Sequence, residues 1–540
     1  MCVLPVFVLL VCAVFAENNN GLFELNILHY NDFHAHFDEI ALNGSPCTPS
    51  QGECIGGYER LYSALRQALE AEPDSLLFNG GDTFQGTMWY NFLRWNVTLH
   101  FMNLLPQHDA HVLGNHEFDN GIEGLLPYLK GLNSPMLGAN VNTTFEPELS
   151  PYVKNHIVVE RKGRKIGIIG ILLTGFTAPI GKVIMEDELE AVRREAALLT
   201  EQHVDIIIVL SHVGYATDMR LAALMPPEVD IIVGAHTHTL LYNGAVAPDG
   251  SRPAGPYPTV VTQASGHRIP VVQASAYTRY LGDIKLFFDD AGKIVSWEGQ
   301  PIYLGTSIVK DERMASLIAP WREEVHTEGK EVLSASLTEL NRGDCRRREC
   351  NIGSWICDNF IGEAIPRATG TSWGYAHACL INNGGIRAHV SAGEITTEGI
   401  LMAMPFENKV QVYDLKGSYL LEALEFSVSL GDAQGFNRMV QIGGIRVVYN
   451  ATAAPGSRVL SARVRCLHCD VPRYEPLDVE VTYRLITQDF IANGGGGFLM
   501  LANNRENVED VDVDYLVLRR SLRRHGTVIQ DLDGRIQIVH

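Results

Sequence analysis

Between residues 23 and 304, short apolar runs alternate with amphipathic stretches, and this alternation restricts the fold of the 540-residue chain more than any other feature. Short apolar runs fit buried strands, and apolar residues spaced three and four apart fit helices. The expected strands are 24–29, 75–78, 165–173, 204–210 and 229–233, and an expected helix is 58–71. Strands that alternate with helices predict an α/β domain of layered sheets and helices.

The second half of the chain mixes its elements differently. Residues 444–449 and 479–486 fit strands, and residues 419–429 fit a helix. Between the halves, residues 306–327 predict a helix that Pro320 interrupts, because proline has no amide hydrogen and clashes with the preceding turn. We therefore expect an α/β domain over 23–304, a helical connector over 305–330 and an α+β domain over 331–540.

Residues 1–16 are apolar and end in Ala-Val-Phe-Ala, which predicts a signal peptide although the segment lacks Lys and Arg. A membrane anchor is the alternative, but the run is shorter than the roughly 20 residues of a bilayer span and ends at polar residues. The other terminus carries no hydrophobic tail of the kind that a GPI signal requires. These features predict a secreted product without a membrane anchor.

The cysteine count also fits an oxidising compartment. Of ten cysteines, Cys2 and Cys12 fall in the predicted signal peptide, and an even number remains. The short spacings suggest the pairs Cys47 with Cys54, Cys345 with Cys350, Cys357 with Cys379, and Cys466 with Cys469. Eight cysteines allow 105 pairings, however. The Cys466-Leu-His-Cys469 segment could also be half of a zinc knuckle, but the sequence has no second pair of this kind, which favours a disulfide.

Four Asn-x-Ser/Thr sequons predict glycans on exposed loops of a secreted chain. They begin at Asn43, Asn96, Asn142 and Asn450.

The formal net charge of −20 predicts an acidic surface, which argues against a nucleic acid or an anionic membrane as partner. An anionic substrate would then need a local positive site, which metal ions and a few arginines would supply. Nothing in the sequence indicates the oligomeric state.

Residues that can bind metals follow the expected strands directly, at the edge where open α/β sheets bind ligands. A lone histidine more often packs in a loop, but seven ligand-type residues in these positions predict two divalent ions that share a carboxylate and lie about 3.5–4 Å apart. The expected arrangement has Asp82 as the bridge, Asp32, His34 and His238 in one site, and Asn115, His212 and His236 in the other.

These segments resemble the 5′-nucleotidase family. The motifs that carry the resemblance are Asn31-Asp-Phe-His, Gly114-Asn-His-Glu-Phe-Asp-Asn-Gly121 and Ala492-Asn-Gly-Gly. The match covers nearly all of the chain after the signal peptide and is similar to animal ecto-5′-nucleotidases and arthropod salivary apyrases. It implies a calcineurin-like metallophosphoesterase domain, a C-terminal nucleotide-binding domain and the cysteine pairing suggested above. The implied cofactors are two divalent ions, usually zinc, with other divalent ions as the alternative.

The resemblance also implies roles for single residues. His116 and Asp119 match a catalytic dyad, in which the histidine stabilises developing charge or protonates the leaving oxygen. His238 occupies a place that varies in the family, although its imidazole is a competent ligand. The residues that match nucleotide contacts are Arg346, Asn382 and Arg387, and those that match the aromatic pair around the base are Phe406 and Phe490.

Two departures from the family pattern bear on substrate choice. Gly496 stands where animal nucleotidases carry an aspartate that binds the ribose hydroxyls, and the lost hydrogen bond would weaken binding by roughly 1.5–3 kcal/mol. Asn383 stands where glycine is more usual, which leaves open whether Asn382 or Asn383 faces the ligand.

We therefore predict a secreted nucleotide phosphohydrolase that cuts extracellular ATP and ADP to AMP and phosphate, an apyrase of the salivary anti-platelet type. The alternative is a 5′-nucleotidase that hydrolyses AMP to adenosine. A third hypothesis is a binder of nucleotides or of a host protein that keeps the fold without catalysis. The complete set of ligand and dyad residues argues against this third hypothesis.

Overall fold

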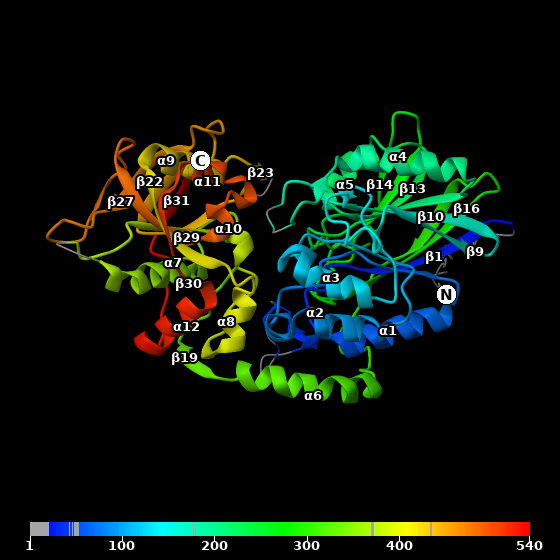
Figure 1. Cartoon of the computed structure of the whole chain (residues 1–540), viewed down its shortest axis with the longest axis horizontal. Coiled ribbons are helices and arrows are strands. Elements are labelled where there is room, and N and C mark those ends of the chain that lie inside the picture. The colour runs from blue at the N-terminus through cyan, green and yellow to red at the C-terminus, as the bar shows by residue number, and fades with distance from the viewer. Residues whose placement is uncertain are drawn as a thin grey trace, which may run out of the picture.

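The computed structural model describes residues 21–540, apart from 43, 46, 48–52, 177, 179, 369–371 and 433–434. The predicted signal peptide and the first sequon lie outside the described residues. Figure 1 shows two lobes, one formed by the first half of the chain and one by the second, with helix α6 (Glu312–Gly329) below the first lobe and leading toward the second. This arrangement confirms the predicted pair of mixed α/β domains.

The first domain contains two sheets. In one sheet, β1 pairs with β4 in parallel and with β16 in antiparallel orientation, and the order is β17-β16-β1-β4-β5-β6-β8. Its strands are β1 (Phe23–Tyr30), β4 (Leu76–Asn79), β5 (Ala110–Val112), β6 (Met136–Leu137), β8 (Val153–Lys154), β16 (Tyr280–Phe288) and β17 (Ile294–Gly299), with β18 (Ile302–Tyr303) beside β16. The other sheet has the order β14-β15-β13-β12-β10-β9. Its strands are β9 (His156–Arg161), β10 (Arg164–Leu172), β12 (Ile206–His212), β13 (Val229–Val233), β14 (Thr259–Thr262) and β15 (Arg268–Val272).

Strand β1 shows why the first domain forms layers. Leu25 and Ile27 lie in the core between the two sheets, whereas Leu28 and Tyr30 lie in the core against the helices. Successive residues of a strand point to opposite faces, so a strand buried on both faces is apolar almost throughout. The helices of this domain are α1 (Tyr58–Ala71), α2 (Met88–Met102), α3 (Gly121–Gly131), α4 (Glu188–Glu201) and α5 (Tyr215–Ala222).

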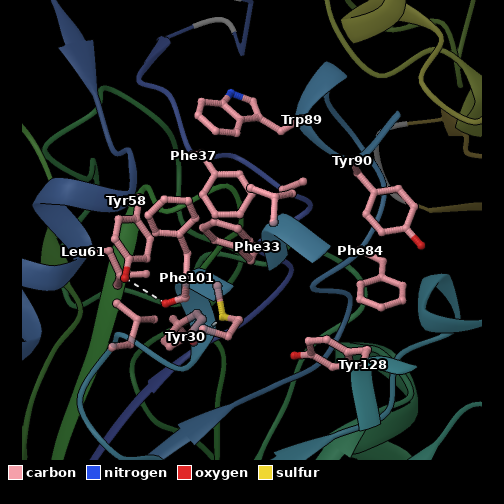
Figure 2. Close-up of a cluster of buried hydrophobic side chains, with 14 of the residues drawn as sticks. Tyr30, Phe33, Phe37, Tyr58, Leu61, Phe84, Trp89, Tyr90, Phe101 and Tyr128 are labelled. Atoms are coloured by element: carbon pink, nitrogen blue, oxygen red, sulfur yellow. Dashed lines mark hydrogen bonds between the residues drawn. The ribbon is translucent and has the colours of Figure 1, made fainter. Parts of the chain in front are cut away.

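An aromatic cluster joins α1, α2 and the loop after β1 (Figure 2). The ring centroid of Phe37 lies 5.0 Å from that of Trp89 and 5.5 Å from that of Phe101. The Tyr58 hydroxyl donates a hydrogen bond of 2.8 Å to the backbone carbonyl of Phe101. The cluster therefore ties both helices to the loop that carries the first metal-type residues.

Helix α6 continues through Pro320, so the predicted interruption is wrong. An interior proline removes one helical hydrogen bond and costs about 3 kcal/mol. Met314, Ile318 and Val325 are buried on α6, which packs on α1 and α2 of the first domain and on α8 (Thr397–Ala403) of the second. Tertiary packing of this apolar side outweighs the local penalty of the proline.

The second domain has a five-stranded sheet with helices on both faces. The sheet order is β25-β20-β29-β22-β30, and a four-stranded sheet, β28-β27-β26-β31, lies beside it. The strands are β20 (Ala378–Asn382), β22 (Lys409–Lys416), β25 (Val440–Gly443), β26 (Ile445–Asn450), β27 (Val459–Arg465), β28 (Tyr474–Pro476), β29 (Thr482–Gln488), β30 (Glu506–Val513) and β31 (Ile536–Val539), and β19 (Val332–Ser336) pairs with β21 (Gly393–Thr396). One core contains residues of α7 (Asn351–Ala364), α8 and α12 (Asp514–His525), and the other contains residues of α9 (Gly417–Ser427), α10 (Asp489–Ala492) and α11 (Leu499–Asn504).

The structure confirms the suggested disulfides and corrects the placement of the sequons. The bonds join Cys47 to Cys54, Cys345 to Cys350, Cys357 to Cys379, and Cys466 to Cys469. Asn96 lies within α2, Asn142 ends the short strand β7 (Val141–Asn142) and Asn450 ends β26, so none of these three lies on a loop. Within the described part of the chain, no helix has the length and apolar character needed to cross a bilayer.

Asp230 of β13 should make stability depend on pH. Its carboxylate accepts a hydrogen bond of 2.8 Å from the amide of Ile207, and burial raises the pKa of Asp230 to about 8. Because the unfolded chain releases this proton at lower pH, the folded state loses stability as pH rises from about 4 to about 8, by at most about 1.4 kcal/mol per pH unit. We expect the thermal unfolding midpoint of Asp230→Asn to fall less over this range than that of the wild type. Calorimetry at several pH values would measure the midpoints, with exposed Asp74→Asn as control. Midpoints of wild type and Asp230→Asn that fall equally with pH would contradict the prediction.

Candidate active site

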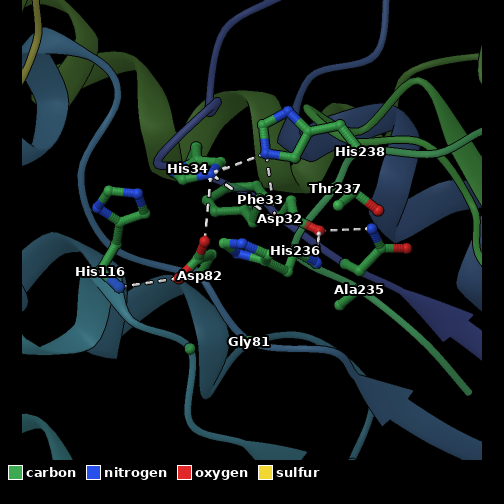
Figure 3. Close-up of polar contacts among 12 residues, drawn as sticks. Asp32, Phe33, His34, Gly81, Asp82, His116, Ala235, His236, Thr237 and His238 are labelled. Carbon is green, nitrogen blue, oxygen red and sulfur yellow. Dashed lines mark hydrogen bonds and ion pairs between the residues drawn. The ribbon is translucent and has the colours of Figure 1, made fainter. Parts of the chain in front are cut away.

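The predicted metal ligands lie where strands of the two sheets end. They follow β1, β4 and β5 in the first sheet and end or follow β12 and β13 in the second. Figure 3 shows that the histidine rings and the two aspartates from these separate loops turn toward one another. The residues brought together from the two sheets are Asp32, His34, Asp82, His212, His236 and His238.

Two groups of side chains form, with Asp82 near both. In the first, His238 Nε2 lies 3.2 Å from Asp32 Oδ1 and 3.3 Å from His34 Nε2. In the second, His212 Nε2 lies 3.0 Å from Asp82 Oδ2, and His236 belongs to the same group. Asp82 Oδ2 also lies 3.6 Å from His34 Nε2 in the first group. A carboxylate in this position can serve two ions at once.

The donor atoms fit two divalent cations. Four buried polar atoms from the predicted ligands make no hydrogen bond, although two of them lie at the ion-pair distances given above, and buried polar atoms nearly always form hydrogen bonds. These atoms are Asp32 Oδ1, Asn115 Oδ1, His212 Nε2 and His236 Nδ1. His34 and His212 use their Nδ1 atoms toward the backbone carbonyls of Gln85 and Gly80, at 2.8 and 2.6 Å, which directs Nε2 of each ring toward the site. Nitrogen and carboxylate donors of this kind suit zinc and similar ions.

Most of these side chains extend from left-handed backbone. The φ angles are 52° at Asp32, 47° at His34, 50° at Asp82, 73° at His236 and 54° at His238. Residues other than glycine rarely adopt this conformation, and such strain concentrates at functional sites. Backbone hydrogen bonds between the two loops stabilise it, because the amides of Asp32 and His34 donate to the carbonyls of Gly81 and Asp82.

The electrostatics of the site keep the carboxylates ionised. Although burial favours the neutral acid, His238 holds the pKa of Asp32 at about 2. Burial lowers the pKa of His212, but the charge of Asp82 more than compensates and raises it to about 10. Burial, helped by His212, lowers the pKa of His236 to about 4. The carboxylates are therefore charged, and a cation bound here would take the place of the proton on His212, because a ligating imidazole must be neutral.

Glu117 contacts the loops of the candidate site, although the sequence assigned it no role. Its carboxylate accepts hydrogen bonds from the amides of Asp82 at 3.0 Å, Thr83 at 2.6 Å and Gly114 at 2.7 Å. Burial and the neighbouring Asp82 raise the pKa of Glu117 to about 7. Glu117 therefore ties together two loops that carry ligands. Its place inside the Asn-His-Glu motif was the available signal.

His116 and Asp119 form the predicted dyad geometry. The imidazole Nδ1–H of His116 donates to Asp119 Oδ2 at 2.7 Å, which leaves Nε2 available on the other side of the ring. The His116 amide donates to Asp82 Oδ1 at 2.9 Å, so the dyad adjoins the metal ligands. Burial lowers the pKa of His116, but Asp119 and Asp82 raise it by more. A protonated imidazole next to the two-metal site can donate a proton to a leaving oxygen.

The second domain contributes Arg387 and Phe406 to this centre. The Nη2 atom of Arg387 lies 3.4 Å from Nε2 of His34 and 3.4 Å from Nε2 of His238. The Phe406 ring stacks on His116 with centroids 5.1 Å apart and planes 11° apart, and the Arg387 guanidinium lies 5.3 Å from the Phe406 centroid. A cation and an aromatic ring from one domain therefore meet the ligands of the other.

The other predicted nucleotide residues, Arg346, Asn382 and Phe490, belong to the second domain, where Phe490 packs against the core around α9 and α11. Asn382 ends β20, and its Oδ1 is buried without a hydrogen bond. The Nδ2 of Asn383 donates to the Met439 carbonyl at 3.2 Å. Because this bond engages Asn383, Asn382 is the better candidate to face a ligand.

Known families match both halves of the chain. The family of calcineurin-like phosphoesterases matches residues 25–240, and that of the 5′-nucleotidase C-terminal domain matches residues 326–503. The fold and these matches define a metal-dependent phosphoester hydrolase.

Full-length relatives narrow this class. An apyrase of Tabanus yao is 40% identical over 530 residues, which cover 97% of this chain and 95% of the relative. The 5′-nucleotidase of Homo sapiens is 36% identical, covering 96% and 91% of the two chains. The crystal structure of a 5′-nucleotidase precursor from Thermus thermophilus superposes with a TM-score of 0.85 at 32% identity, covering 96% of this chain and 99% of the other. The chain belongs to the 5′-nucleotidase family, as its motifs predicted.

Proposed function

We propose that the protein is a secreted apyrase that hydrolyses extracellular ATP and ADP to AMP and phosphate with two zinc ions. The observation that carries this proposal is the 40% identity to the Tabanus yao apyrase across 97% of the chain. Residues 23–304 would form the metal-binding domain, 305–330 the connector and 331–540 the nucleotide-binding domain. An anti-platelet role in saliva would follow from removal of ADP.

Gly496 supports weaker binding of the ribose. Its φ of +65° is a conformation that side chains rarely adopt, and an added Cβ would meet nothing closer than the Phe498 ring at 3.7 Å. Space for a side chain therefore exists, but this chain places no carboxylate there. Without that acceptor, the ribose hydroxyls lose a hydrogen bond, and the protein restricts the position of the ribose less.

The ligand residues Asp32, His34, Asp82, Asn115, His212, His236 and His238 would hold the ions, which supply Lewis-acid activation of water and of the phosphoryl group. Arg387, beside His34 and His238, would bind a phosphate oxygen. His116, oriented by Asp119, would hold a proton on Nε2 for the leaving oxygen. Arg346 and Asn382 would contact the nucleotide, and Phe406 and Phe490 would stack on the base.

The second candidate is an AMP-hydrolysing 5′-nucleotidase, favoured by the 36% identity to the human enzyme. Both functions would use the same centre and differ in which phosphate reaches the metal ligands.

Product analysis should separate the two functions. We expect the purified protein to release phosphate from ATP and ADP, to accumulate AMP, and to lose activity in a chelator because the ions supply the activation of water. Chromatography of nucleotides and nucleosides over time would measure the substrates and products, with the enzyme in chelator as control. Rapid conversion of AMP to adenosine would instead establish the 5′-nucleotidase, and no hydrolysis of any of the three would revive the hypothesis of a binder.

A further inference from the structure

Helix α2 of the first domain changes direction at Arg94, and the chain of the second domain turns at Glu407. Arg94 has φ 54° and ψ −146° inside the helix, and Glu407 has φ 55°. Both have a positive φ, which residues other than glycine rarely adopt, and such conformations persist only where surrounding contacts hold them. The two strained residues face each other across the boundary between the domains.

Two contacts join α2 to this turn. Arg94 Nη1 donates to Glu407 Oε2 at 2.8 Å, and Asn91 Nδ2 donates to the Pro405 carbonyl at 2.9 Å. Asn91 is 7% exposed, and the Arg94–Glu407 pair is partly buried. Pro405 and Glu407 immediately precede and follow Phe406, so the first domain contacts the backbone before this residue and the side chain after it.

The position of Phe406 matters because its ring stacks on His116 and lies beside Arg387. Its placement relative to the metal ligands thus depends on direct contacts with α2, in addition to the fold of its own domain. Without them, the turn could shift locally while the metal ligands stayed in place, and Arg387 could also stay in place, because its amide donates separately to the Ala403 carbonyl.

We propose that Asn91, Arg94 and Glu407 form an interdomain clasp that positions Phe406 for the nucleobase at a set distance from the phosphate-binding centre. This inference rests on the proposed function and deepens it, because it assigns nucleotide recognition to residues that contact neither base nor phosphate. Arg94 and Glu407 are positioning residues. The clasp should affect substrates through their base and leave the binding of a bare phosphate group unchanged.

The test uses Arg94→Gln and Glu407→Gln, which remove the charge pair and keep similar side-chain volumes. We expect each to raise KM roughly tenfold, as for loss of a charged hydrogen bond, with kcat within about twofold and the inhibition constant of inorganic phosphate unchanged. The exchanged pair Arg94→Glu/Glu407→Arg should recover much of the lost affinity. Arg66→Gln, which breaks the exposed Arg66–Glu70 pair on α1, is the matched control. The substrate is ADP or AMP, whichever the wild type cleaves faster.

An unchanged KM in both single variants would overturn the clasp while the proposed function stood. An equal rise in KM and in the phosphate inhibition constant would also overturn it, since the effect would then not act through the base. A wild type that cleaves neither nucleotide would refute the proposed function and remove the basis of the clasp. A selective rise in KM with recovery in the exchanged pair would support it.

Discussion

Asp82→Asn will lose at least one metal ion and nearly all activity. Asp82 Oδ2 lies 3.0 Å from His212 Nε2 and 3.6 Å from His34 Nε2, so one carboxylate adjoins both ligand groups. Asparagine keeps the size of the side chain and an oxygen for the His116 amide, but it lacks the charge and the second oxygen that two cations would share. We expect kcat to fall about a thousandfold or more, at least as much as loss of an oxyanion-hole donor.

Metal content measured by inductively coupled plasma mass spectrometry should fall from two zinc ions per chain to one or none. Asp249→Asn is the matched control, because Asp249 belongs to the same domain but its oxygens are bonded to Ser251 and Arg279 and, among the described residues, face no histidine cluster. An Asp82→Asn protein with two ions and wild-type turnover would show that Asp82 is not the bridge.

His116→Ala should separate catalysis from metal binding. The His116 ring is oriented by Asp119, and the hydrogen bond from His116 to Asp82 comes from the backbone amide, so alanine keeps that hydrogen bond. A general acid contributes about 10²- to 10⁴-fold to the rate, and we expect kcat to fall by that factor while metal content stays the same.

The control for this variant is His156→Ala, which removes another histidine–carboxylate pair, with Glu195, at 2.6 Å and away from the centre. Turnover and metal analysis of both variants would decide the role. Full turnover in His116→Ala would refute the assignment of the dyad. Loss of metal together with turnover would mean that the imidazole is a ligand and not the acid.

The local pattern of the chain was enough to predict the layers of the first domain and the place of the ligands. Residues 229–233 coincide with β13 (Val229–Val233), and residues 58–71 with α1 (Tyr58–Ala71), because burial on one or both faces imposes a period on the sequence. Asp32, Asp82 and His236 follow their strands directly, so the prediction of the sheet also placed them at its edge. Their roles as ligands stay predictions until metal is measured.

Predictions that treated a local signal as decisive were less successful. Pro320 lies inside α6 because Met314, Ile318 and Val325 are buried against both domains. The prediction considered only the local cost of a proline in a helix and left out the free energy of this packing. Asn96 was expected on a loop, but it lies in α2, because a sequon specifies chemistry and not backbone conformation.

By itself, the sequence determined the family, the strand and helix periods, the cysteine pairs suggested by short spacing, and the residues available for metal. Only the tertiary structure decided which of them meet: Arg387 beside His34, Phe406 on His116, and Glu117 between two ligand loops. The clasp between Arg94 and Glu407 also joins residues 313 positions apart. Local periodicity arises from neighbours a few residues apart, whereas these contacts depend on how whole sheets and domains pack, which no short segment encodes.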